Sequence, residues 1–315
     1  MSILKKALAA AVVAGLVSTV GVVPANAAPK NQARSVAQPD WLEANVDNPK
    51  VRIIEVSTEP GLYERGHIKN AIKFVWHTDL VDTVNRDIIN AKNFSKLVQK
   101  AGISDDTTVV LYGDKNNWFA AWGAWIFNIY GQKDVRVLDG GRVKWEKDGR
   151  PLTTAVPTFS AGNFVATKAD KALRATLIND VLPVAKKRVK ADLIDIRGAD
   201  EFNGKIFAAP GFQELAVRAG HIPGAINVPW GANVNADGTF KSVAELKKLY
   251  ADKGVDGKQN IITYCRIGER SSLTWFVLSE ILGYNVKNYD GSWTEYGNSV
   301  GVPIVNNAGT IWGAA

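Results

Sequence analysis

The stretch Asn260-Ile-Ile-Thr-Tyr-Cys-Arg-Ile-Gly-Glu-Arg-Ser-Ser-Leu-Thr-Trp-Phe-Val-Leu278 decides the fold and contains the chain's only cysteine. Its apolar run ends at Tyr264 and is typical of a buried strand, and Gly268 permits a positive φ in the short loop that follows. Ser271 or Ser272 can cap a helix that continues to the end of the stretch. The pattern therefore predicts a strand, a tight loop and a helix.

Cys265 lies at the expected carboxyl end of this strand and faces the N-terminus of the expected helix. Loop amides and the helix dipole direct partial positive charge at its sulfur, and Arg266 and Arg270 add full charges. These conditions lower the pKa of a thiol and make its thiolate a nucleophile. The alternative is a buried structural cysteine, but two nearby arginines and a glycine do not suit an apolar core.

The chain repeats its pattern, which predicts two related domains that arose by duplication. The matching segments are Val51–Ser57 with Ala191–Arg197, Arg65–Ile72 with Ala219–Ile226, Val109–Asp114 with Asn260–Cys265, and Val137–Arg142 with Lys287–Ser292. Each half alternates strand-length apolar runs with helix-length segments. This alternation predicts the α/β class, with a parallel sheet flanked by helices in each domain and a functional crevice at the carboxyl ends of the strands. We expect domains at 36–150 and 163–305, joined by a proline-containing linker.

The composition excludes several classes of protein and of site. Of 315 residues, 46% are apolar and 22% charged, which is typical of a globular protein and not of a disordered or coiled-coil chain. One cysteine cannot form an internal disulfide or a zinc site with several cysteines, and we predict neither a metal nor a cofactor. The net charge of +7 is not concentrated in a basic stripe. It therefore does not favour nucleic-acid binding, but it suits a small anionic substrate.

The N-terminal segment has the pattern of a secretory signal peptide, residues 1–27. Lys5 and Lys6 precede an apolar run, and Ala25-Asn-Ala27 supplies a cleavage site. The alternative is a membrane anchor, but the run is short and is diluted by glycine, serine and threonine. We therefore predict an exported protein in the periplasm, cell envelope or medium, with no stable membrane association after cleavage. A monomer is expected, because the duplication already supplies an internal domain pair.

The length of the cysteine loop bears on the chemistry. A thiolate in an anion-binding loop can attack phosphorus, as in cysteine phosphatases, whose loop is one residue longer than the four residues between Cys265 and Arg270. The smaller loop suits one additional sulfur on the cysteine better than a tetrahedral phosphate. This favours sulfur transfer through a persulfide stabilised by loop amides. A phosphatase or arsenate-type enzyme on the same architecture, and a non-enzymatic sulfur- or anion-binding module, are the alternatives.

Four motifs in order, Asp195-Ile-Arg197, Gly220–Ala225, Cys265–Arg270 and Asp290–Trp293, resemble those of tandem-domain rhodaneses of the thiosulfate sulfurtransferase family. The resemblance implies a silent first domain and a catalytic second domain. It also implies transfer of the sulfane sulfur of thiosulfate to cyanide or another thiophile through a Cys265 persulfide. The expected partners are therefore a small anionic sulfur donor and a thiophilic acceptor.

The resemblance also assigns roles to single residues. Cys265 is the catalytic nucleophile and sulfur carrier. Asp195 orients its neighbours, Asp290 shapes a turn near the pocket, and His221 is better explained as a structural histidine than as a ligand or acid–base group. The substrate-binding residues are Arg197, Arg266, Ile267, Gly268, Glu269 and Arg270.

Three positions depart from the patterns of the family. Ile267 replaces a lysine that some thiosulfate enzymes carry, so donor binding depends more on the arginines. Arg266 replaces the glycine of mercaptopyruvate-type relatives, which argues against that larger donor. Asp114 occupies the position of the nucleophile in the first half. Because a carboxylate cannot carry a persulfide, we expect that half to be catalytically silent.

Overall fold

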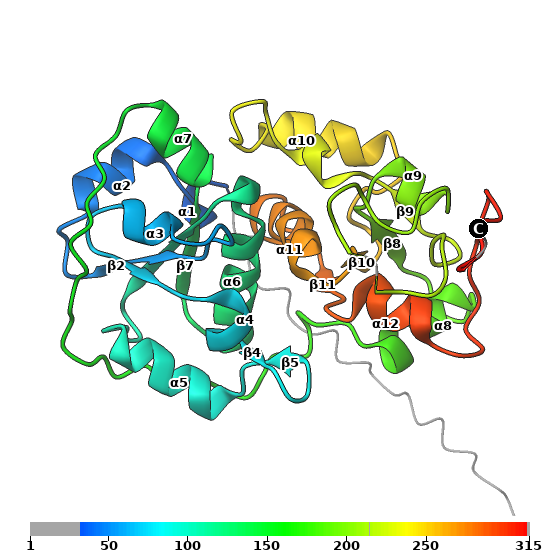
Figure 1. The fold of residues 1–315 in the computed structure, drawn as a ribbon, viewed down its shortest axis with the longest axis horizontal. Helices are drawn as coiled ribbons and strands as arrows, with labels where there is room; N and C mark the ends of the chain where they lie inside the picture. The colour runs from blue at the N-terminus through cyan, green and yellow to red at the C-terminus, as the bar shows by residue number, and fades with distance from the viewer. Residues whose placement is uncertain (1–31, 214, 314–315) are drawn as a thin grey trace, which may run out of the picture.

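Two parallel sheets lie side by side in the structure, a computed structural model that describes residues 32–213 and 215–313 (Figure 1). Each sheet is flanked by helices, so the predicted α/β class is confirmed. The predicted signal peptide lies outside the described residues, and export stays a prediction. Within the described part of the chain, no helix is both long enough and apolar enough to cross a bilayer.

The first sheet belongs to the N-terminal half and is parallel throughout, with the strand order β1-β7-β6-β2-β3. Its interior strand β2 is buried at every position, as expected of a parallel strand covered on both faces. The strands are β1 (Val36–Ala37), β2 (Val51–Glu55), β3 (Ala71–Lys73), β6 (Thr108–Tyr112) and β7 (Asp134–Leu138).

Short helices and one hairpin complete the first domain. The hairpin pairs β4 (Val81–Asp82) with β5 (Asp87–Ile88) and projects towards the second domain. The helices are α1 (Gln32–Ser35), α2 (Pro39–Asn45), α3 (Leu62–Arg65), α4 (Trp76–Asp79), α5 (Ala91–Lys100), α6 (Trp118–Ile129) and α7 (Gly141–Lys147), with a 3-10 turn η1 (Lys115–Asn117).

The second sheet repeats the first, with the order β11-β10-β8-β9. Arg174 forms a parallel bridge to Asn288 of β11 and so takes the edge position that β1 has in the first sheet. The strands are β8 (Asp192–Asp195), β9 (Ile226–Asn227), β10 (Ile261–Tyr264) and β11 (Val286–Asn288). The helices are α8 (Leu182–Ala185), α9 (Ala199–Phe202), α10 (Val243–Ala251), α11 (Glu269–Phe276) and α12 (Ser292–Asn298), with the turns η2 (Leu177–Val181), η3 (Trp230–Asn233) and η4 (Val277–Ile281).

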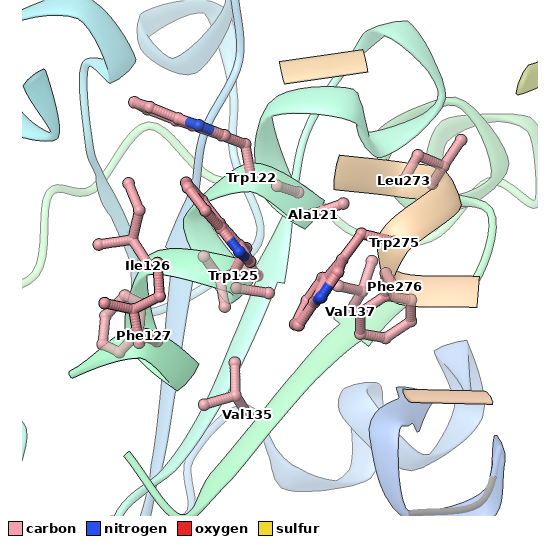
Figure 2. Close-up of a cluster of buried hydrophobic side chains, with 14 of the residues drawn as sticks. Ala121, Trp122, Trp125, Ile126, Phe127, Val135, Val137, Leu273, Trp275 and Phe276 are labelled. Carbon is pink, nitrogen blue, oxygen red and sulfur yellow. The ribbon is translucent and has the colours of Figure 1, made fainter. Parts of the chain in front are cut away.

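The two domains share one apolar core, in which α6 packs against α11. Trp122 and Trp125 of α6 and Trp275 and Phe276 of α11 are buried in it (Figure 2). Helix α6 is apolar on nearly all sides, which fits a helix enclosed between two domains. Because α11 begins directly after the cysteine loop, this packing brings the first domain against that loop.

Candidate active site

The cysteine loop connects β10 to α11, as the sequence predicts. Gly268 has a φ of +100°, and a Cβ atom there would lie 2.5 Å from the carbonyl oxygen of Asp290. Only glycine fits this position, since an added side chain would be strained and would also clash. The bend directs the Gly268 N–H at the sulfur of Cys265, at a distance of 3.1 Å. The loop therefore supplies a backbone donor to the sulfur.

Cys265 is fully buried, with 0% of its surface exposed. Its backbone N–H donates to Oγ of Ser292 at 3.0 Å, and that oxygen lies 4.0 Å from Sγ. Burial raises the pKa of the thiol, but the charge of Arg270 and the N–H groups of Gly268, Ser271 and Ile267 outweigh it and lower the pKa below the ordinary value. The site therefore favours a thiolate, the reactive form of cysteine.

Arg266 and Arg270 both lie close to one aromatic ring. The guanidinium carbons of Arg266 and Arg270 are 5.6 and 5.7 Å from the ring centre of Phe212, within range of cation–π attraction. Arg266 also donates to the carbonyl oxygen of Gln213 at 2.7 Å, and Arg270 lies 3.5 Å from the carboxylate of Glu201. The structure thus places both arginines at the loop and covers them with Phe212.

Phe212 belongs to a segment that the first domain lacks. Ten positions separate Ser57 from His67 in the first half, whereas 24 separate Arg197 from His221 in the second. The additional residues follow α9 and reach the arginines of the cysteine loop. From the sequence alone, this difference in spacing could have predicted an additional segment next to the cysteine loop in the second half.

The guanidinium group of Arg197 forms hydrogen bonds to other groups of the protein. Its Nε and Nη2 donate to the carboxylate of Asp195 at 3.0 and 2.6 Å, and Nη2 also donates to the carbonyl oxygen of Gly220 at 2.7 Å. The guanidinium carbon lies 4.7 Å from the ring centre of Trp293. Asp195 therefore orients Arg197, and a contact between Arg197 and substrate stays a prediction.

His221 makes contacts suited to a structural role. Its ring stacks on Phe202 with centroids 3.6 Å apart, and Nδ1 lies 2.7 Å from the carbonyl oxygen of Phe202. A carbonyl only accepts, so Nδ1 carries the proton. Burial lowers the pKa of His221, which favours the neutral ring. In the first domain His67 stacks in the same way on Tyr63.

Asp290 joins the cysteine loop to the first domain, a role that sequence patterns did not indicate. Its buried carboxylate accepts from Nη1 of Arg86 at 3.0 Å and from the indole N–H of Trp122 at 3.2 Å. Arg174 lies 3.4 Å away. Arg86 also donates to the carbonyl oxygen of Ile267 at 2.5 Å. The first domain therefore supports the loop directly, although nothing in the sequence pairs Arg86 with Asp290.

Asp114 of the first domain has a structural function in this fold. Its carboxylate accepts hydrogen bonds from both the N–H and the hydroxyl of Thr58 at 3.0 Å and from the N–H of Glu59 at 2.9 Å. These hydrogen bonds tie the loop that contains Asp114 to the segment at Thr58. A carboxylate at this position provides no thiol that could carry sulfur. Among the residues that the structure describes, no group of three or more histidine, cysteine or acidic side chains is placed to hold a metal.

Comparison with known proteins agrees with this geometry. A model of the rhodanese-like domain matches residues 38–148 and 182–299. A protein of Mycolicibacterium smegmatis named "Putative thiosulfate sulfurtransferase" is 52% identical over 267 residues, which cover 84% of this chain and 95% of that protein. "Sulfur carrier protein TtuD" of Thermus thermophilus is 51% identical over 269 residues, with 84% and 94% coverage.

A solved structure gives the same result for the fold. SseA from Escherichia coli, described with the 3-mercaptopyruvate sulfotransferases, has a TM-score of 0.70 and 28% identity and covers 82% of this chain and 98% of that chain. The fold and these relatives together support sulfur transfer as the chemistry of the site. The chain is therefore a tandem-domain rhodanese of the thiosulfate sulfurtransferase family.

Proposed function

We propose that this protein moves the sulfane sulfur of thiosulfate to cyanide or another thiophile through a persulfide on Cys265. The observation that carries this proposal is the Cys265 sulfur, which receives the Gly268 N–H at 3.1 Å and whose pKa is lowered, despite burial, chiefly by Arg270. A sulfur that is stabilised as an anion at the N-terminus of α11 can attack a sulfane sulfur and can then carry it.

The reaction proceeds in two displacement steps. The Cys265 thiolate attacks the outer sulfur of thiosulfate, a bond forms between Sγ and that sulfur, and sulfite leaves with the electron pair of the broken sulfur–sulfur bond. Cyanide then attacks the outer sulfur of the persulfide, thiocyanate leaves, and the Cys265 thiolate is restored. Loop N–H groups hold the anion in both forms, and Arg266 and Arg270 attract the anionic donor.

Single-turnover kinetics test this proposal. Mixing the protein with thiosulfate alone is expected to release one sulfite per active site in a rapid phase and then stop, because no acceptor removes the sulfur. Addition of cyanide is expected to produce an equal amount of thiocyanate. Sulfite release that requires cyanide from the start would contradict the proposed persulfide intermediate.

A protein acceptor is a second candidate for the thiophile. The support is the relative from Thermus thermophilus, whose name describes a sulfur carrier. The two candidates share the first step and differ only in what collects the sulfur. The two candidate acceptors are distinguished by the rate at which the sulfur leaves the loaded protein. This rate is measured with cyanide alone and again in the presence of a sulfur-accepting protein.

Access to Cys265 requires that a covering side chain moves, because the thiol is fully buried. Phe212 lies over both arginines of the loop and is itself 46% exposed. We therefore expect Phe212→Ala to accelerate alkylation of Cys265 by iodoacetamide several-fold. Ile206→Ala, in the same segment, is the matched control and is expected to react like the unmodified protein. Equal rates for all three proteins would show that Phe212 does not limit access.

A further inference from the structure

The turn that joins α8 to β8 contains the most concentrated positive charge of the chain. It reads Lys186-Lys187-Arg188-Val189-Lys190, four cations in five residues, and all five side chains are exposed. We call residues 186–190 the basic turn. Within the part of the chain that the structure describes, none of its four cations takes part in an ion pair or a side-chain hydrogen bond. Asp180, the acid that precedes the turn, is bound instead to Nζ of Lys287 at 2.7 Å. The cations are therefore free to contact an anion outside the protein.

Lys187 has a backbone conformation that lysine rarely adopts. Its φ is +56°, in the left-handed region. The N–H of Lys187 donates to the carbonyl oxygen of Val184 at 2.8 Å, and the N–H of Arg188 donates to that of Pro183 at 2.8 Å. Helices that end with this pair of hydrogen bonds usually have glycine at the position of Lys187, because a Cβ atom is unfavourable there. A lysine that is kept at a glycine position points to a use for its charge.

The basic turn lies at the edge of the second sheet opposite to the cysteine loop. Lys190 comes directly before the segment that enters β8 at its amino end, whereas Cys265 follows the carboxyl end of β10. Strands β8 and β10 are parallel neighbours, so these two ends lie at opposite edges of the sheet. Helix α8 lies beside α12, on the side of the second domain away from the first (Figure 1). A partner bound to the basic turn therefore leaves the cysteine loop open.

Two apolar side chains extend this surface. Val189 is 53% exposed, and Val300, in the segment after α12, is 100% exposed. Lys186 and Lys187 line one shallow depression together with residues 301–303, so the two segments are neighbours. Neither the lining of this depression nor the residues 186–190 and 300–303 include an acidic or an aromatic side chain.

This composition suits a membrane surface better than a nucleic acid. Exposed valines among free cations match the interface of a bilayer, where cations contact lipid phosphates and apolar side chains enter the headgroup region. A single-stranded nucleic acid would instead be bound with the help of aromatic side chains that stack on its bases.

We propose that the basic turn and Val300 form a docking surface for a bilayer that contains anionic phospholipids. The cations attract the lipid phosphates, and Val189 and Val300 enter the headgroup region. This attachment is peripheral and reversible, because salt screens exposed charges. The inference goes beyond the proposed sulfur transfer and does not depend on it. A protein docked in this way holds its cysteine loop away from the lipid.

Co-sedimentation with vesicles tests the proposal. The vesicles contain equal parts of phosphatidylcholine and phosphatidylglycerol or phosphatidylcholine alone, and the quantity measured is the ratio of the two partition coefficients. At low ionic strength we expect a ratio of at least about a hundred, because each cation near an anionic surface contributes about a fivefold preference. Lys187→Gln/Lys190→Gln is expected to lower the ratio about twentyfold. A ratio near one for the unmodified protein, or a ratio that salt does not lower, would overturn the proposal.

Matched variants separate a specific surface from the net charge of the protein. Lys168→Gln/Lys171→Gln removes the same charge from exposed lysines that line a different depression, and its ratio is expected to stay within about twofold of the unmodified protein. Val300→Ser keeps the charge and is expected to weaken binding to the anionic vesicles several-fold. All variants retain residues 1–27, so a contribution of that segment is the same in each. Equal losses in the two double variants would overturn the assignment, as would charge-dependent binding to a single-stranded oligonucleotide without binding to vesicles.

Lys187→Gly tests the argument from the backbone. Glycine adopts the positive φ freely, so this variant is expected to raise the melting temperature by about 2 °C while it lowers the vesicle ratio about fivefold. Lys187→Gln is the matched control, since it loses the same charge but keeps the unfavourable Cβ atom, and no rise in melting temperature is expected. A lower melting temperature in Lys187→Gly would show that the lysine serves stability and would overturn the role given to its charge.

Discussion

Replacement of Cys265 by serine is expected to abolish sulfur transfer, with a loss of at least about 10⁴-fold in turnover of thiosulfate and cyanide. Serine fits the same buried position between the loop and Ser292, so the fold is retained. Its hydroxyl does not ionise near neutral pH and cannot form a persulfide. Thiocyanate formation under saturating thiosulfate and cyanide measures the effect, and near-UV circular dichroism monitors the tertiary structure.

The first domain supplies the matched control for this variant. Asp114 occupies the position of the nucleophile there and is bound by Thr58 and Glu59. Asp114→Asn replaces one of the two accepting oxygens by an NH2 group and so disturbs only that loop, which carries no thiol; it is expected to leave turnover within about twofold of the unmodified protein. Substantial activity in Cys265→Ser, or a comparable loss in Asp114→Asn, would show that the cysteine loop of the second domain is not the only centre of chemistry.

Arg270→Gln is expected to lower turnover at neutral pH by about a hundredfold, the effect of removing one strong donor from an anion-binding site. Arg270 is the leading cause that lowers the pKa of Cys265, and backbone N–H groups of the loop add to its effect. Without it the pKa of the thiol rises, and the thiolate needs a higher pH to form. The rate of alkylation as a function of pH is therefore expected to shift towards alkaline pH.

Arg266→Gln is the matched control for Arg270, because both arginines contact Phe212 and Arg270 is the leading cause of the lowered pKa of the thiol. Arg266→Gln is expected to weaken thiosulfate binding and to leave the pH dependence of alkylation in place. Identical alkylation profiles for both variants would mean that Arg270 has no specific effect on the thiolate.

The cysteine loop was predictable because its features are local. A buried strand and a glycine that must adopt a positive φ lead into a helix within a few residues, and the fold reproduces this order from β10 to α11. The predicted serine cap was wrong, because the helix already begins at Glu269 after Gly268 and has no side-chain cap, so Ser271 and Ser272 lie inside it. The duplication was predictable for the same reason, and the four strands of the second sheet have the same order as their counterparts β7-β6-β2-β3 in the first. Short-range patterns of this kind depend on backbone geometry, which the local sequence largely determines.

The support from the first domain was not predictable, because it depends on contacts between residues that are distant in sequence. Arg86 lies in a hairpin with no motif, yet it bonds Asp290 and the Ile267 carbonyl. Asp195 was expected to orient its neighbours, but the contact of Arg197 with the Gly220 carbonyl oxygen was not predictable, because nothing in the sequence pairs these two residues. The spacing between the two halves did contain a signal for Phe212, since only the second half has the additional segment.

Mass spectrometry of the protein after treatment with thiosulfate tests the central claim most directly. We expect a gain of ~32 Da, one sulfur, located on the peptide that contains Cys265 and lost after addition of cyanide. The buried, anion-stabilising environment of the thiol is the reason for this expectation. No added sulfur, or sulfur on any other residue, would contradict the proposed sulfur transfer through Cys265.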